Sequence, residues 1–144
     1  MTQKMEGHGT IRLVINSCLN DIFLMGLAAR SFCDFTPLPQ STSYQIELCI
    51  IEAVTNAVKH AYRGESNHEV EMIVTLDSGQ ITFQICDSGI AMKPLETAVM
   101  DFDPDDCQTI PESGMGLFII QSVMDDVCYT TVNNKNILTM CKRY

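Results

Sequence analysis

The chain has 144 residues, of which 46% are hydrophobic and 19% charged, and its formal net charge at pH 7 is −9. This length suits one domain with a buried core, and the hydrophobic content argues against intrinsic disorder. The acidic balance, without a basic run to meet phosphates, disfavours a nucleic-acid partner. We therefore expect residues 1–144 to form a single globular domain that does not contact nucleic acid directly.

Neither export nor a membrane span is predicted. Residues 1–10 lack the apolar core of a signal peptide, and the apolar run at 22–29 is too short to cross a bilayer. The seven cysteines are widely spaced and include no CxxC pair, which argues against a disulfide framework and against a zinc site. Such cysteines are typical of free thiols packed as small apolar residues. We expect a cytoplasmic protein without membrane contact.

The first half of the chain predicts a strand followed by two helices. Residues 10–15 alternate weakly and are rich in β-branched side chains, which favours a strand. A helix running to about residue 33 follows, and a break at 36–39 separates it from a longer helix at 41–62. The first helix is expected to turn these apolar residues toward the core: Leu19, Ile22, Phe23, Met25, Leu27 and Ala28.

A hairpin and a long loop come next. Residues 70–76 and 81–86 alternate and flank the turn sequence DSGQ, which predicts an antiparallel pair. Residues 90–113 show no regular period and contain three prolines. A loop of this length in a compact domain is typical of a lid or a binding loop.

The last third of the chain predicts a helix and a second hairpin. The helix covers 116–124, and the strands 127–132 and 137–141 flank the turn 133–136. The complete order is strand, helix, helix, hairpin, helix, hairpin. This order predicts an α+β fold: a two-layer α/β sandwich whose mixed, mainly antiparallel sheet carries helices on one face.

Three polar side chains recur within EAVTNAVKHAY, at 52–62. Glu52, Asn56 and His60 are four residues apart, and four residues advance about 40° around an α-helix, so they would line one stripe. A carboxylate there can act as a general base, an amide oxygen can bind Mg²⁺, and an imidazole can contact phosphate. Taken alone, the spacing favours the alternative of a solvent-exposed helix face.

Two further motifs lie at the ends of predicted elements. Asp87 ends an apolar strand, and its carboxylate can accept a hydrogen bond from the amino group of adenine, while Gly89 allows a close turn. An ordinary turn explains these two residues equally well. Gly114, Met115 and Gly116 open the third helix, where free N–H groups favour phosphate, although a flexible junction is the alternative. Together, the order and placement of the motifs indicate a nucleotide site.

The segments EAVTNAVKHAY, ICDSGIAM, ESGMGLFIIQSVMDDV and ILTMCKR resemble those of the anti-sigma-factor serine/threonine kinases of stress-response and sporulation switches. These bacterial proteins belong to the ATPase superfamily of gyrase, Hsp90, histidine kinases and MutL. The resemblance covers nearly the whole chain. It implies a Bergerat-type fold in which ATP and Mg²⁺ bind between the helical face of the sheet and a lid at 90–113.

The resemblance also implies roles for individual residues. Glu52 would be the catalytic base, Asn56 the Mg²⁺ ligand, and Asp87 the residue that recognises adenine, supported by Thr139. Lys93 is the candidate lid cation for the γ-phosphate. The positions expected to contact the nucleotide are Asn56, His60, Arg63, Asp87, Gly89, Lys93, Gly114, Met115, Gly116, Leu117 and Thr139.

The activity implied is ATP-dependent phosphorylation of a serine or threonine on a small antagonist protein. The same chain, as a homodimer, would act as an anti-sigma factor that binds a sigma factor, and phosphorylation of the antagonist would control this partner switch and hence transcription. Two alternatives are a detached histidine-kinase catalytic domain and an ATP-binding interaction module without catalysis. Glu52 argues against both, because it is unusual in histidine kinases and a module without catalysis has little reason to keep it.

Overall fold

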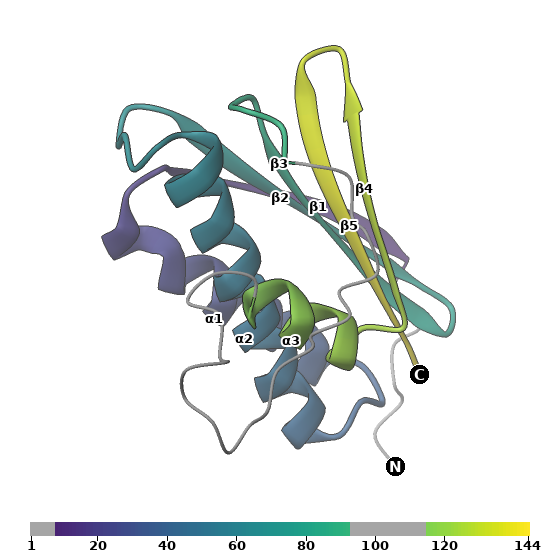
Figure 1. Cartoon of the computed structure of the whole chain (residues 1–144). Coiled ribbons are helices and arrows are strands. Elements are labelled where there is room, and N and C mark those ends of the chain that lie inside the picture. The colour runs from purple at the N-terminus through teal and green to yellow at the C-terminus, as the bar shows by residue number, and fades with distance from the viewer. Residues whose placement is uncertain (1–7, 93–114) are drawn as a thin grey trace, which may run out of the picture.

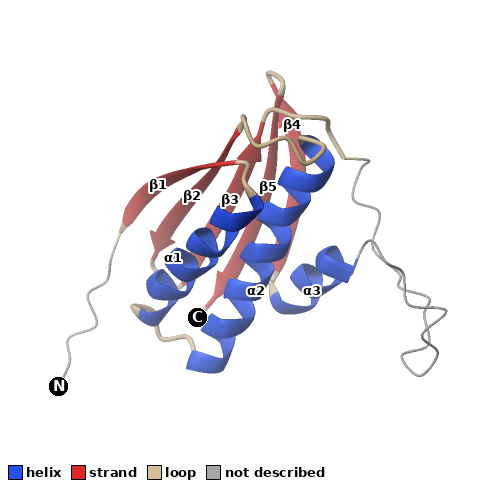
Figure 2. Ribbon diagram, turned by 90° about the vertical axis from the view of Figure 1, so that its left-hand side faces the viewer, coloured by secondary structure: helices blue, strands red, loops and turns tan. Residues whose placement is uncertain are grey.

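The computed structural model describes residues 8–92 and 115–144. The strands are β1 (Gly9–Asn16), β2 (Glu69–Asp77), β3 (Gln80–Asp87), β4 (Asp126–Val132) and β5 (Lys135–Arg143). They form one sheet in the order β1-β2-β3-β5-β4, and every neighbouring pair is antiparallel. The helices cover one face of this sheet, as Figures 1 and 2 show. The predicted two-layer α+β sandwich is confirmed, and its described strands are antiparallel rather than mixed.

The helical layer has α2 at its centre. Its elements are the 3₁₀ turn η1 (Leu19–Asp21), α1 (Ile22–Asp34), α2 (Gln40–Asn56), the π-helical turn η2 (Ala57–Ala61) and α3 (Met115–Val123). Helix α2 packs against α1 on one side and α3 on the other (Figure 2). Within residues 8–92 and 115–144, no helix has the length and apolar character that crossing a bilayer requires.

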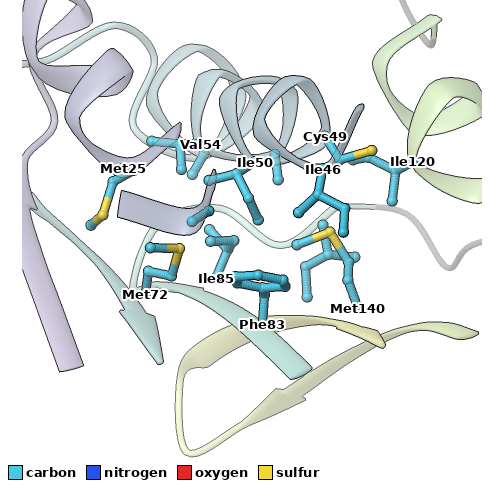
Figure 3. Packing of buried hydrophobic residues seen from close by; sticks show 14 of the residues in the cluster. Met25, Ile46, Cys49, Ile50, Val54, Met72, Phe83, Ile85, Ile120 and Met140 are labelled. Atoms are coloured by element: carbon cyan, nitrogen blue, oxygen red, sulfur yellow. The ribbon is translucent and has the colours of Figure 1, made fainter. Parts of the chain in front are cut away.

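The core lies between the helices and the sheet. Ile46 and Ile50 of α2 are fully buried and face Phe83 on β3 (Figure 3). Burying one such side chain stabilises the fold by roughly 1.5–3 kcal/mol. Cys33 and Cys49 share this core, where burial raises the pKa of each thiol to about 12. The two thiols therefore stay neutral and pack as small apolar groups, as predicted.

The predicted core face of the first helix is partly wrong. Leu19, Phe23 and Leu27 are 53%, 53% and 38% exposed. Gly26 explains the orientation of α1, because a Cβ there would lie 2.8 Å from Cγ1 of Ile51 on α2. The side of α1 that carries Gly26 therefore faces α2. The buried residues of α1 are Ile22, Met25, Gly26, Ala29 and Cys33.

The predicted helix at 41–62 changes its winding before it ends. Regular α-helix stops at Asn56, and the N–H of Tyr62 donates to the carbonyl of Ala57, five residues back, at 3.1 Å. This wider turn interrupts the four-residue stripe, and His60 is exposed. Gly64, with φ of 77°, then terminates the helix as predicted.

The last hairpin turns on two residues rather than four. Asn133 and Asn134 have φ of 51° and 61°, which suits the tight hairpin turn that antiparallel strands prefer. Strand β5 therefore begins at Lys135, earlier than predicted. As a result, Asn136 lies within the strand and is paired in register with Asp87 of β3.

Candidate active site

The α2 side of the site is built from Glu52 and Asn56, one helical turn apart. Both side chains are half-buried. The first turn of α3 lies directly against Glu52, because a Cβ added at Gly116 would lie 2.5 Å from Oε2 of Glu52. A glycine at 116 thus allows the start of α3 to approach the carboxylate closely. Asn56 lines a pocket, and the Glu52 carboxylate lies one helical turn before it, against the start of α3.

The pocket lies between the end of α2 and the sheet and holds about 390 Å³ of empty space, including the part open to solvent. Most of its walls are apolar, which is typical of small-molecule sites. The structure therefore places Asn56, Asp87 and Leu117 around the same space. The lining residues are Ala53, Asn56, Ala57, Ala61, Ile85, Asp87, Met92, Leu117, Tyr129 and Leu138.

Asp87 is held by a hydrogen-bond network at the end of β3. Its Oδ1 accepts from the N–H of Gly89 at 3.0 Å and from Nδ2 of Asn136 at 2.8 Å. Nδ2 of Asn136 also donates to the carbonyl of Gly89, and Oδ1 of Asn136 accepts from the hydroxyl of Thr131. Among the described residues, Oδ2 of Asp87 has no hydrogen-bond partner. The carboxylate therefore has a fixed orientation and one free acceptor.

Burial has the largest effect on the pKa of the Asp87 carboxyl. Loss of solvent raises its pKa, and the hydrogen bonds from Asn136 and Gly89 act in the opposite direction. A carboxylate kept partly out of water strengthens any hydrogen bond that a ligand donates to it. Asp87 thus combines the burial and the free acceptor that recognition of an amino group requires.

Gly89 is required by the close approach of two backbones. The N–H of Ile90 donates to the carbonyl of Ala61 at 2.9 Å, which fixes residues 87–90 against the end of η2. A Cβ at Gly89 would lie 2.3 Å from that carbonyl oxygen and 2.5 Å from its carbon. Both are backbone atoms, so a larger residue would have to displace the chain itself.

We expect Gly89→Ala to lower the free energy of unfolding by about 1–3 kcal/mol, the scale of overpacking in a tight site. Gly9→Ala is the matched control, because a Cβ at Gly9 meets nothing within 4 Å. Urea denaturation of both variants measures the difference. Equal stability of the two variants would show that residues 87–90 are not confined as the structure indicates.

Several residues that were predicted to contact the nucleotide lie outside the pocket that Asp87 lines. Arg63 is exposed and, with Gly89, lines a separate shallow depression, while His60 lines neither space. Thr139 lies between the core residues Leu138 and Met140, so its side chain points to the opposite face of the sheet. There its hydroxyl accepts from Gln84 at 3.5 Å. The structure therefore does not bring Thr139 to Asp87.

Three predicted residues cannot be placed in the site. Lys93 and Gly114 lie outside the described residues, as does the predicted lid. The backbone of Met115 begins α3, but its side chain is also outside the described part. The proposed phosphate contacts of these residues stay predictions.

Two residues of the site were not predicted. Asn136, which is 1% exposed, holds Asp87, and Tyr129 lines the pocket while its hydroxyl accepts from the N–H of Met92 at 2.9 Å. The alternation of Asn136 with Leu138 and Met140 could have indicated that Asn136 faces the core. The predicted turn at 133–136 includes Asn136 and therefore conceals this alternation.

The donor set suits an adenine nucleotide with Mg²⁺. The pocket offers apolar walls for a ring and the Oδ2 acceptor of Asp87 for an amino group. Mg²⁺ commonly takes one or two protein oxygens together with substrate phosphates, and the amide oxygen of Asn56 is such a ligand. Within the described parts of the chain, no three His, Cys, Asp or Glu residues cluster as an all-protein metal cage would require.

Sequence comparison agrees with this architecture. The model of the histidine kinase-like ATPase domain family matches residues 17–142. Serine-protein kinase RsbW of Listeria monocytogenes serotype 4a is 28% identical over 113 residues, which cover 76% of this chain and 68% of that protein. The anti-sigma F factor of Geobacillus sp. WCH70 is 32% identical over 103 residues, covering 69% and 68%. The chain therefore belongs to the anti-sigma-factor kinase family within the histidine kinase-like ATPases.

Solved structures share the fold at low sequence identity. One contains the RsbU and RsbW domains of a Mycobacterium tuberculosis protein, with a TM-score of 0.65 and 14% identity, over 94% of this chain and 32% of that one. A second is a histidine kinase domain from the blue-light activated histidine kinase of Erythrobacter litoralis, with a TM-score of 0.55 and 18% identity, over 90% and 61%. The chain thus spans less than two thirds of either solved chain, and these likenesses concern the fold alone.

Proposed function

We propose that this chain is an ATP-dependent serine/threonine protein kinase that phosphorylates a small anti-sigma-factor antagonist. The observation that carries this proposal is the half-buried carboxylate of Glu52, which lies against the first turn of α3 and one helical turn before Asn56, a residue of the Asp87 pocket. The names of the sequence relatives, a serine-protein kinase and an anti-sigma factor, support the same function.

Different residues of the site recognise the base and accept the proton. Bound ATP would supply the phosphoryl group, and Mg²⁺ would neutralise the charge on its phosphates. Asp87 orients the base through Oδ2, and the backbone at Gly116 offers N–H groups at the start of α3. Glu52 accepts the proton of the attacking serine or threonine hydroxyl. His60, Arg63 and Lys93 remain candidates for phosphate contact.

We expect Asn56→Ala to weaken Mg·ATP binding by about tenfold, the scale of one polar contact to a charged group. Its amide oxygen is the proposed protein ligand of the metal, so ATP binding without Mg²⁺ should change little. Asn67→Ala is the control, since Asn67 is an exposed loop residue. Calorimetric titration with and without Mg²⁺ checks both, and an Asn56→Ala variant that binds Mg·ATP like wild type removes Asn56 from the metal site.

The proposed biological role is a partner switch in the bacterial cytoplasm. A homodimer of the chain would bind either the unphosphorylated antagonist or a sigma factor. Phosphorylation adds negative charge to the antagonist, and the chain described here already carries a net charge of −9. Like-charge repulsion at the interface would therefore favour release of the product and free the chain for the sigma factor.

Size-exclusion chromatography of the chain with the antagonist encoded by a neighbouring gene tests this role. The expected result is a complex that persists with Mg·ADP and dissociates with Mg·ATP as the antagonist becomes phosphorylated. A complex that binds ATP but never modifies the antagonist would instead support an interaction module without catalysis. A labelled histidine on the chain itself would support the histidine-kinase alternative.

A further inference from the structure

Residues 87–90 are fixed to the end of the long helix by one side chain as well as by backbone contacts. The N–H of Ser88 donates to the hydroxyl of Tyr62 at 2.8 Å. One residue earlier on the helix, the carbonyl of Ala61 accepts the N–H of Ile90 at 2.9 Å. The backbone contact is available to any residue at 61, whereas the contact with Ser88 requires a hydroxyl at 62.

The Tyr62 hydroxyl is held from two sides. It accepts from Ser88 and donates to the carbonyl of Glu69, the first residue of β2, at 2.7 Å. The side chain is 6% exposed, and its ring stacks on that of His68 with centroids 4.5 Å apart and planes 8° from parallel. Nε2 of His68 in turn lies 2.8 Å from Oε2 of Glu65. These contacts hold the phenol ring in one orientation, with the hydroxyl proton directed to Glu69 and the oxygen accepting from Ser88.

The phenol of Tyr62 is neutral at physiological pH, as an ordinary tyrosine is, and loss of solvent raises its pKa further. A neutral phenol can donate to Glu69 and accept from Ser88 at the same time, which a phenolate cannot do. The link between β2 and residues 87–90 is thus maintained under working conditions.

We propose that Tyr62 is a positioning residue that fixes the carboxylate of Asp87 for nucleotide recognition. It acts through Ser88, which is covalently joined to Asp87 and precedes Gly89, the donor to Oδ1. Asp87 is therefore fixed from the β5 side by Asn136 and from the helix side by Tyr62. This inference rests on the proposed function, because it assigns Tyr62 to the affinity and selectivity of the same site.

Tyr62→Phe tests this role because it removes one oxygen and retains the ring that stacks on His68. Loss of a neutral hydrogen bond that orients Asp87 should weaken ATP binding about threefold to tenfold and reduce the preference for ATP over GTP. The transfer rate at saturating ATP should stay near that of wild type, because Glu52 and Gly116 are untouched. A purely structural loss would lower the folded fraction without changing the ATP-to-GTP ratio.

Tyr144→Phe is the matched control. Its hydroxyl also makes two hydrogen bonds, to the carbonyls of Asp77 at 3.0 Å and Gln80 at 3.2 Å. These lie at the β2–β3 turn, at the opposite end of β3 from Asp87. Both variants lose one tyrosine hydroxyl, so nucleotide affinity should change in Tyr62→Phe and stay unchanged in Tyr144→Phe.

Hydrogen exchange of the Ser88 amide tests the geometry without any nucleotide. In the wild type this N–H should exchange slowly although Ser88 is an exposed residue, and exchange should accelerate in Tyr62→Phe. Fast exchange in the wild type would overturn the inference even if the variant did not fold. ATP affinity and selectivity in Tyr62→Phe equal to those of the wild type would also overturn it. A wild type that binds no ATP would instead contradict the proposed function.

Discussion

Glu52→Gln should abolish most phosphate transfer to the antagonist while leaving ATP binding intact. We expect the transfer rate to fall about 10²- to 10⁴-fold, the usual contribution of a positioned general base. Glutamine keeps the size of the side chain beside Gly116, where the carboxylate lies close enough to exclude a Cβ. The variant therefore loses the ability to accept a proton and retains the shape of the pocket.

Glu47→Gln on the same helix controls for loss of a carboxylate from α2. Glu47 pairs with Arg30 at 2.9 Å, and this partly exposed ion pair contributes up to about 1 kcal/mol to stability. At equal folded fraction, Glu47→Gln should transfer phosphate at the wild-type rate. Single-turnover transfer and equilibrium ATP binding separate the two effects. Unchanged transfer by Glu52→Gln would remove Glu52 from proton transfer.

Asp87→Asn should reverse the preference for ATP over GTP. Gly89 and Asn136 both donate to Oδ1 of Asp87, so an asparagine at 87 would turn its carbonyl oxygen toward these donors. Its NH₂ group would then replace Oδ2 and face the base. An amino donor there repels the amino group of adenine and suits the carbonyl of guanine. We expect ATP affinity to fall about tenfold or more, as for loss of a hydrogen bond to a charged group.

Asp77→Asn, at the exposed end of β2, controls for the loss of an acidic side chain. Competition between ATP and GTP at several pH values measures the selectivity. Because burial raises the pKa of Asp87, the wild type should lose ATP affinity on acidification at a higher pH than an ordinary aspartate would cause. Asp87→Asn should lack that acid-dependent loss. A variant that retains the full preference for ATP would refute recognition of adenine by Asp87.

The fold could be predicted because its signals are local. The alternation in β2 and β3 and the long apolar face of α2 each lie within one segment, and their order specifies the layers. The α1 face was predicted incorrectly because Phe23 and Leu27 have the spacing of core residues. Whether they are buried depends on how closely Gly26 lets α1 approach α2, which is a tertiary contact.

In the site, too, local features could be predicted and tertiary contacts could not. Asp87 and Gly89 lie on one turn, and Glu52 and Asn56 lie on one helix, so the sequence could indicate them as pairs. Asn136 becomes visible only through the pairing of β3 with β5 and the two-residue turn that sets its register.

Tyr62 and Thr139 illustrate two further limits of prediction. The role of Tyr62 depends on Ser88, 26 residues away in the sequence. Thr139 lies next to the core-facing residues Leu138 and Met140 on β5. Because successive side chains of a strand point to opposite faces of the sheet, Thr139 faces away from the core.

The proposed function is the transfer of phosphate from ATP to a hydroxyl of a protein partner. Its most direct test is to incubate the chain with the antagonist, Mg²⁺ and γ-labelled ATP, and to map the modified residue by mass spectrometry. We predict a single phosphorylated serine or threonine on the antagonist, formed by the wild type and not by Glu52→Gln. Label on a histidine, or an antagonist that stays unmodified although ATP binds, would contradict the account.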